Sequence, residues 1–154
     1  MIGITLSGKT THVDNNYLPG YQLVSLNHMK NAITFTKIQP VDVVYAAMEI
    51  IVRAHMIKGL PIVVDENNIT VDSLFLWKTL TRDHGYNLKA VLMDTPLDVC
   101  TARVKYLLNG KKITEQMHEK LSKEHEQVNE LKKILKMKHQ SVVDEVTIIT
   151  YDGG

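Results

Sequence analysis

The 154-residue chain is poor in cysteine and contains no long apolar run, and each scarcity excludes a class of protein. Its single cysteine, Cys100, excludes an intramolecular disulfide framework and any zinc or iron–sulfur site built from several cysteines. No apolar stretch approaches the roughly 20 residues that span a bilayer, and the first residues lack a signal-peptide pattern. We therefore expect a soluble cytoplasmic protein with no membrane partner; the oligomeric state cannot be predicted from the sequence.

The charge is almost balanced, with 18 Lys and Arg residues against 17 Asp and Glu residues and a formal net charge of +1. This balance argues against a protein that binds nucleic acid by generalised phosphate attraction, although it leaves room for a local basic pocket. Only three of the basic residues are arginines: Arg53, Arg82 and Arg103. Arginine is the usual choice for bidentate phosphate recognition, so few positions can supply it.

Short β-rich runs alternate with helical segments along the chain. The pattern predicts strands at 21–26, 60–65, 88–94 and 146–151, and helices at 41–58, 71–84, 96–107 and 114–138. Several strands are apolar on consecutive residues, which is typical of strands buried on both faces. The alternation therefore predicts an α/β protein with a parallel sheet covered by helices on both faces, in one domain of residues 1–154.

Three of the helices carry finer predictions. The helix at 41–58 is apolar nearly all round, so we expect it to be buried. Thr95 is predicted to cap the helix that starts at Pro96. The helix at 114–138 is expected to pack through one apolar stripe, formed by Met117, Leu121, Val128, Leu131 and Leu135.

Four other residues could suggest chemistry, but packing or solvation explains them better. Cys100 and Trp77 each lie within a predicted helix, and we expect both to pack in the core. His118 and His125 are seven residues apart on one helix, too far to share a zinc ion without a further ligand.

Residues 3–10, GITLSGKT, satisfy the pattern G-x-x-x-x-G-K-[ST] in full. Small residues let backbone amides turn around a phosphate, Lys9 would reach the β- and γ-phosphates, and the Thr10 hydroxyl would ligate Mg²⁺. The following helix would point its N-terminus at the anion. The motif predicts ATP and Mg²⁺ as cofactors, with nucleotide-binding residues Gly3, Ser7, Gly8, Lys9, Thr10 and Thr11. The alternative is an ordinary polar turn.

The start of the chain departs from what this motif usually needs, a buried strand in front of it. Only Met1 and Ile2 precede Gly3. Either the first strand was lost upstream, in a truncated or mis-started chain, or residues 1–6 are themselves a strand and the loop is short. Leu6 also stands where the tightest part of such a loop often has glycine.

Four stretches in order carry a family resemblance: GITLSGKTT, LPGYQLVSLNHMK, GLPIVVDENN, and LMDTPLDVCTARV leading to NGKKITEQM. The chain resembles P-loop kinases of the polynucleotide kinase type, especially small phage-encoded members, over most of residues 3–150. The resemblance implies a three-layer P-loop NTPase-like sandwich with a mainly parallel sheet, a first strand that is short or missing, and a helical lid at about 104–116. It implies transfer of the ATP γ-phosphoryl group to a hydroxyl of a nucleic acid, nucleotide or nucleoside, in the host cytoplasm if phage-encoded.

The resemblance also marks the residues that would act on the acceptor. Asn27, His28 and Lys30 match positions where the family has two aspartates and an arginine. An amide cannot accept a proton, so Asn27 could at most orient a hydroxyl. His28 could replace the lost carboxylate, because the unperturbed pKa of histidine lies near neutrality. Its alternative role is that of a polar residue at a helix start.

The predicted strand at 60–65 ends in Asp65, which the family resemblance assigns to the Mg²⁺ shell, followed by Asn68 on the substrate side. In doubly wound sheets ligands bind at the carboxyl ends of the strands. We therefore expect Lys9, Asn27 and Asp65 to converge.

The predicted lid supplies cations that neutralise the transferring group. Arg103 matches one family arginine, whereas Leu107 stands where another is usual. Lys105, Lys111 and Lys112 lie nearby, but lysine lacks the planar fork of arginine. The alternative for Arg103 is a surface charge.

Three hypotheses follow. The first is a kinase with Lys9, Asn27, His28 and Arg103 as catalytic residues and with Thr10 and Asp65 at the metal. The second is a catalytically weakened relative that binds nucleotide or a partner without efficient transfer. The third is a structural α/β module with no nucleotide. The acceptor cannot be read from the sequence, because the segments that would select it, 28–40 and 66–80, carry no recognisable pattern.

Overall fold

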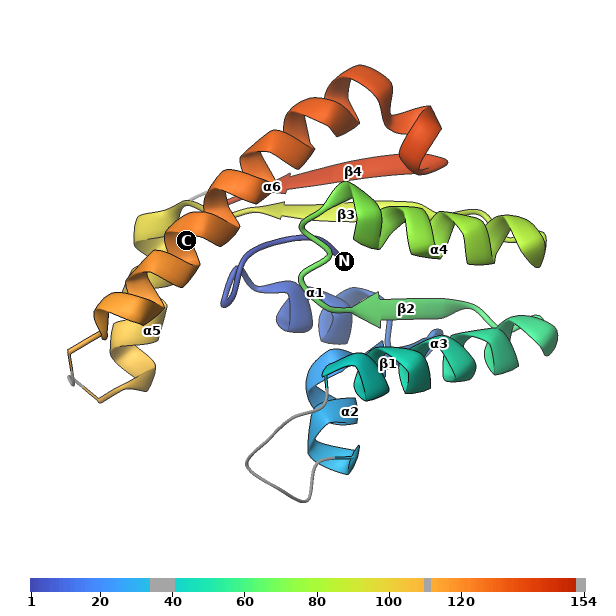
Figure 1. The fold of residues 1–154 in the computed structure, drawn as a ribbon, viewed down its shortest axis with the longest axis horizontal. Coiled ribbons are helices and arrows are strands. Elements are labelled where there is room, and N and C mark those ends of the chain that lie inside the picture. The colour runs from blue at the N-terminus through green and yellow to red at the C-terminus, as the bar shows by residue number, and fades with distance from the viewer. Residues whose placement is uncertain (34–40, 110–111, 152–154) are drawn as a thin grey trace. The chain divides into compact units, whose positions relative to one another are not determined.

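A computed structural model describes residues 1–33, 41–109 and 112–151 of the chain (Figure 1). The chain divides into two compact units, one formed by Met1–Lys9 with Asn67–Gly154 and the other by Thr10–Glu66. All pairings between the described strands are parallel, and helices alternate with these strands along the chain. The predicted α/β fold class is confirmed.

The unit Thr10–Glu66 is built on two parallel strands, β1 (Gln22–Ser25) and β2 (Ile62–Asp65). In their register Ser25 lies opposite Asp65, so both strands end at the same edge. The helices of this unit are α1, α2 and α3, which span Lys9–Asn16, Leu26–Ile33 and Val41–Ile57. Only the first residue of α1, Lys9, belongs to the other unit.

Helix α3 is buried on one face only. Its buried residues recur every four positions, at Val44, Met48, Val52 and Met56. By contrast, Ile50 and Ile57 are 67% and 76% exposed. The prediction of a helix buried all round was wrong, because α3 packs through one face against α2, β1 and β2.

The unit Met1–Lys9 with Asn67–Gly154 contains a second parallel pair, β3 (Lys89–Asp94) and β4 (Glu145–Thr150). Its helices α4, α5 and α6 span Val71–Asp83, Leu97–Leu107 and Glu115–Val142. Ile2 forms an isolated parallel bridge with Leu92 of β3: its N–H donates to the Val91 carbonyl at 2.8 Å, and its carbonyl accepts from the Met93 N–H at 2.8 Å. The residue in front of the motif thus occupies a strand position beside β3.

The core of this unit gathers apolar residues from the chain start, from β3 and from all three helices. It contains Ile2, Ile4, Leu74, Ala90, Leu92, Cys100, Val128, Leu131, Leu135, Val142 and Val143. Cys100 is fully buried, as predicted, and burial raises the pKa of its thiol. The predicted stripe on α6 is confirmed except for Met117, which is 39% exposed in the first turn of the helix.

Most predicted element bounds agree with the structure to within a few residues. A helix start at His28 was considered from the sequence without bounds for α2, and the predicted α6 ended too early, since the helix continues to Val142 past a non-helical Lys138. The prediction that Thr95 caps α5 was wrong: its hydroxyl donates to the Ser7 carbonyl, and the N-cap residue is Pro96. Among the described residues, no helix is both long and apolar enough to cross a membrane.

Candidate phosphate-binding site

The motif at residues 3–10 forms a turn whose backbone explains its small residues. Gly3 has φ 152°, and a Cβ there would lie 2.6 Å from Ser7 Oγ and 3.3 Å from the Met93 carbonyl oxygen. Gly8 has φ 97° and Leu6 has φ 60°. Leu6 thus adopts the left-handed conformation that glycine takes at little cost.

Lys9 is tied into the loop by its own ammonium group. Its Nζ donates to the carbonyl oxygens of Gly3 at 2.9 Å and Ile4 at 2.8 Å, and the residue is only 8% exposed. Lys9 is also the first residue of α1, so the motif leads directly into a helix N-terminus. The first amides of a helix lack intrahelical acceptors and favour an anion there.

Two side chains from β3 and α5 of the same unit hold the loop carbonyls. The Thr95 hydroxyl, just after β3, donates to the Ser7 carbonyl at 2.8 Å. Arg103 Nη1, from α5, donates to the Leu6 carbonyl at 2.9 Å, and its guanidinium lies 5.5 Å from the centroid of the Tyr151 ring. The loop therefore carries a cation beside it that is fixed by a hydrogen bond and a cation–π contact.

A buried carboxylate on α6 holds the first half of the loop. Glu124 Oε2 accepts from the Thr5 N–H at 2.8 Å, and Oε1 accepts from the Thr5 hydroxyl at 3.2 Å and from Asn67 Nδ2 at 3.3 Å. Lys120 Nζ lies 3.8 Å from the same carboxylate. Glu124 is thus a loop contact although it is far away in the sequence.

Sequence reasoning missed Thr95 and Glu124 as loop partners. Thr95 was assigned to capping, a local role that competes for the same hydroxyl. Glu124 had a detectable signal: it lies three residues after Leu121 and four before Val128, on the apolar stripe of α6. A charged residue on a buried face requires a specific partner.

Ser7 is the loop residue whose side chain best fits a missing ligand. It is 2% exposed, and its hydroxyl oxygen has no hydrogen-bond partner among the described residues. Buried polar atoms are almost always paired, so a phosphate oxygen of a nucleotide fits as the partner of this hydroxyl. Ser7 was among the predicted nucleotide contacts.

In the unit Thr10–Glu66, Thr10 meets the predicted metal-binding acid. The Thr10 hydroxyl donates to Asp65 Oδ2 at 2.7 Å, and Asp65 is 5% exposed at the end of β2. A hydroxyl and one carboxylate fit Mg²⁺, which keeps several waters and takes few protein ligands besides phosphate. No cluster of three His, Cys, Asp or Glu residues suited to a metal occurs within the described ranges.

The predicted acceptor-side residues follow the neighbouring strand of this unit. Asn27 and His28 are exposed in the first turn of α2, directly after β1, and Lys30 is half-buried. Because Ser25 pairs with Asp65, Asn27 comes two residues past the strand edge at which Asp65 lies. The convergence of Lys9 with Asn27 and Asp65 stays a prediction. Thr11 is exposed on α1.

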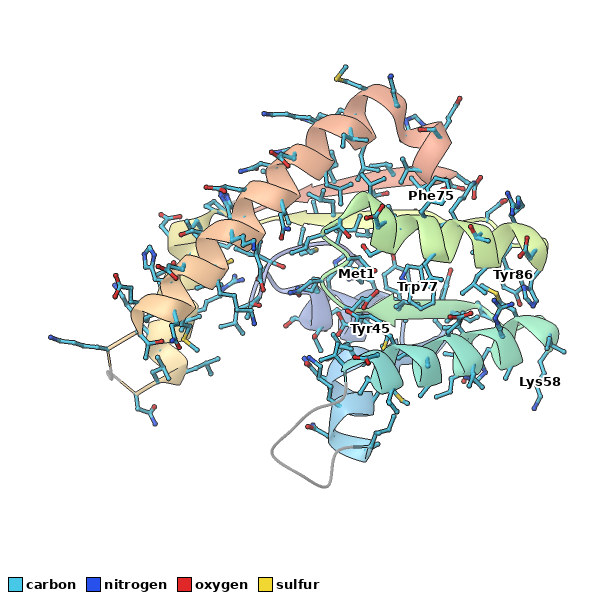
Figure 2. The ribbon with its side chains drawn as sticks, viewed as in Figure 1. Met1, Tyr45, Lys58, Phe75, Trp77 and Tyr86 are labelled. Carbon is cyan, nitrogen blue, oxygen red and sulfur yellow. The ribbon has the colours of Figure 1, made fainter. Side chains whose placement is uncertain are left out.

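Tyr45 of α3, which Figure 2 labels, contacts Glu66, the residue after Asp65. Burial, together with the charge of Glu66 and a hydrogen bond to it, raises the pKa of Tyr45 to about 12. Tyr45 therefore stays a neutral donor at physiological pH and cannot serve as a base for an acceptor hydroxyl.

The side chain of Asn68 makes two hydrogen bonds within the fold, and its predicted place on the substrate side stays a prediction. Its Nδ2 donates to the Met1 carbonyl at 3.0 Å, and its Oδ1 accepts from Trp77 Nε1 at 3.0 Å. Figure 2 shows Trp77 on the side of α4 toward Met1. Trp77 is buried, as its predicted packing role requires, and the Asn68 amide links it to the chain start.

The cationic end of the predicted lid is only partly described. Lys105, Leu107 and Lys112 are exposed, and Leu107 is 63% exposed. Lys111 lies outside the described residues, as does the 34–40 part of the segment expected to select the acceptor.

Comparison with known families finds a family model that matches most of the chain. A family model described as an AAA domain matches residues 1–126, which include the motif, Asp65 and Arg103. A search of curated proteins finds no match. Since the matched part exceeds half of the chain, the protein belongs to this AAA domain family, a P-loop NTPase-type domain that binds nucleotide.

Proposed function

We propose that the protein is an ATP-dependent phosphotransferase that moves the γ-phosphoryl group to a hydroxyl of a nucleic acid, nucleotide or nucleoside. The observation that carries the proposal is the hydrogen bond of 2.7 Å from the Thr10 hydroxyl to Asp65, because it pairs the motif's own oxygen ligand with a strand-end carboxylate. A nucleotide-binding domain with that pair has the ligands that a magnesium–nucleotide complex needs.

Each residue of the motif then has a distinct task. Lys9 and the amides at the start of α1 hold the phosphates, and Ser7 supplies a further hydroxyl. Thr10 and Asp65 hold Mg²⁺, which neutralises charge on the phosphate oxygens when bound. Arg103, already fixed to the Leu6 carbonyl at 2.9 Å, stabilises developing charge on the transferring group.

The acceptor hydroxyl would be oriented by Asn27 or deprotonated by His28. Both are exposed in the first turn of α2, past the strand edge that ends in Asp65. The proposal includes residues 1–154 as one kinase domain, in which the segment at about 104–116 closes over the nucleotide and excludes water.

Two observations favour a second function, that of a weakened protein that binds nucleotide without efficient transfer. Asn27 cannot accept a proton, and Leu107, at a position where related kinases have arginine, is an exposed aliphatic side chain. Each loss removes a group that commonly contributes on the order of a hundredfold or more to rate.

Transfer from γ-labelled ATP tests the proposal directly. The acceptors are single-stranded and duplex oligonucleotides with 5′-hydroxyl ends, nucleosides and nucleoside monophosphates, each with Mg²⁺ and with a chelator. We expect Mg²⁺-dependent labelling of at least one acceptor, abolished in Lys9→Met and retained in Lys58→Met, an exposed lysine. Tight nucleotide binding without labelling of any acceptor would instead support the weakened protein.

A further inference from the structure

The contacts of Glu124 connect α6 to the geometry of the phosphate-binding loop. The residue is 6% exposed, and its carboxylate receives three hydrogen bonds, two of them from Thr5. A buried carboxylate is retained only where donors replace its lost water. The donors here lie on the loop and on Asn67, so the stability of the buried charge depends on how the loop is placed.

One peptide plane carries the influence of Glu124 to Lys9. The Thr5 N–H donates to Glu124 at 2.8 Å, and the carbonyl of the same peptide, that of Ile4, accepts from Lys9 Nζ at 2.8 Å. In a trans peptide the N–H and C=O bonds point in opposite directions. Holding the N–H toward α6 therefore turns the carbonyl toward Lys9.

Asn67 extends the same hold to the start of the loop. Its side chain donates to Glu124 at 3.3 Å, while its carbonyl accepts from the Gly3 N–H at 3.1 Å. Gly3 in turn presents the second carbonyl that binds Lys9 Nζ, at 2.9 Å. Both acceptors of the lysine are thus anchored through groups that Glu124 contacts.

We propose that Glu124 is a positioning residue of the nucleotide site, which orients the Ile4–Thr5 peptide and, through it, Lys9. This inference rests on the proposed function, because it takes a nucleoside triphosphate as the ligand. It predicts that nucleotide affinity depends on the acceptor oxygens of Glu124 and not on its charge, since a negative charge near the loop by itself opposes phosphate binding.

Two variants that remove the same charge separate these effects. Glu124→Gln keeps an acceptor oxygen for the Thr5 N–H, whereas Glu124→Met has similar length and no acceptor. At a temperature where circular dichroism shows every variant folded, we expect Mg-ATP to bind Glu124→Met about tenfold more weakly than Glu124→Gln. The matched control is Glu126→Gln, an exposed glutamate on the same helix, with wild-type affinity. Equal affinities of the two Glu124 variants would overturn the proposal.

Amide hydrogen exchange gives a readout that needs no nucleotide. The Thr5 amide should exchange about tenfold faster in Glu124→Met than in Glu124→Gln, while the Leu92 amide of β3 is unchanged. Unchanged protection of Thr5 would contradict the proposal. Failure of the wild-type protein to bind Mg-ATP would count against the proposed function, and the exchange data would still decide whether Glu124 fixes the loop.

Thr5→Val tests which contact matters, because it removes the hydroxyl and keeps the N–H. We expect Mg-ATP affinity within about threefold of wild type, the size of one weak hydrogen bond. A loss as large as that of Glu124→Met would place the effect on the hydroxyl and overturn the role of the peptide plane.

Discussion

The phosphate-binding loop and the start of α2 differ in how firmly their residues are held. In the loop, Lys9, Thr95, Arg103 and Glu124 all bond to backbone groups, and two glycines with positive φ permit the turn. At the start of α2, Asn27 and His28 are exposed. Groups that are already fixed reduce the free-energy cost of reaching the reactive geometry. The loop is therefore better preorganised than the start of α2.

This difference suggests that nucleotide binding and transfer are separable in this protein. The motif retains every residue type that its pattern requires, whereas Asn27 stands where the kinases that this chain resembles have a carboxylate. Changes in the loop should therefore affect binding, and changes at the start of α2 should affect only turnover.

The largest effect is expected from Lys9→Met. The substitution removes the ammonium that we propose contacts the phosphates, together with its two bonds to Gly3 and Ile4. We expect Mg-ATP affinity measured by calorimetry to fall about a hundredfold or more, as for loss of a charged phosphate contact in a water-poor site. Lys58→Met, in an exposed position, should bind as wild type does, and wild-type affinity in Lys9→Met would contradict the account.

Asp65→Asn should distinguish the contribution of Mg²⁺ to ATP affinity from that of the nucleotide alone. The amide oxygen can still accept from the Thr10 hydroxyl, so the fold is expected to persist, but the negative ligand for Mg²⁺ is lost. We expect the Mg²⁺-dependent part of ATP affinity to fall about tenfold or more, with affinity in chelator little changed. Asp42→Asn, an exposed acid of α3, is the control. Equal Mg²⁺ dependence in both variants would remove Asp65 from the metal site.

Asn27→Asp tests the acceptor side. A carboxylate restored at this exposed position should raise the rate of labelled phosphate transfer about tenfold, less than the roughly hundredfold or more of a fully positioned general base, and leave ATP affinity unchanged. Thermal stability should change little, as for most exposed substitutions. If the rate does not rise while ATP still binds, the acceptor hydroxyl is not served from the start of α2.

Leu6 gives the smallest expected effect, on stability. Its φ of 60° costs a non-glycine residue roughly 1 kcal/mol. Leu6→Gly and Leu6→Ala both remove the side chain beyond Cβ, but only glycine relieves the strain. The free energy of unfolding in urea should therefore be larger for Leu6→Gly than for Leu6→Ala by about that amount. Equal stabilities would show that the strained conformation is not populated in solution.

Sequence reasoning succeeded where local patterns decide the structure. The helices that stop near Gly59 and Gly85, the strand ending in Asp65 and the motif itself all depend on neighbours within a few residues. Ile2 occupies a strand position through its backbone bonds to Val91 and Met93, whereas residues 3–6 form no strand, and both interpretations of the chain start stay predictions.

Sequence reasoning failed where a partner far away in the sequence determines the role of a side chain. The Thr95 hydroxyl could cap a helix or bind a carbonyl, and only the fold brings the Ser7 carbonyl 88 positions away within 2.8 Å. The Asn68 side chain donates to the Met1 carbonyl, 67 positions away. The Glu124 contact with Thr5 likewise spans 119 positions. No local pattern contains such information.

Titration calorimetry of the wild-type protein with Mg-ATP and, separately, Mg-AMP tests the central claim most directly. A loop built for the β- and γ-phosphates predicts ATP binding with a Kd in the micromolar range and AMP binding at least about tenfold weaker. Folded protein that shows no binding of Mg-ATP up to about 1 mM, or that binds AMP as tightly as ATP, would contradict the account.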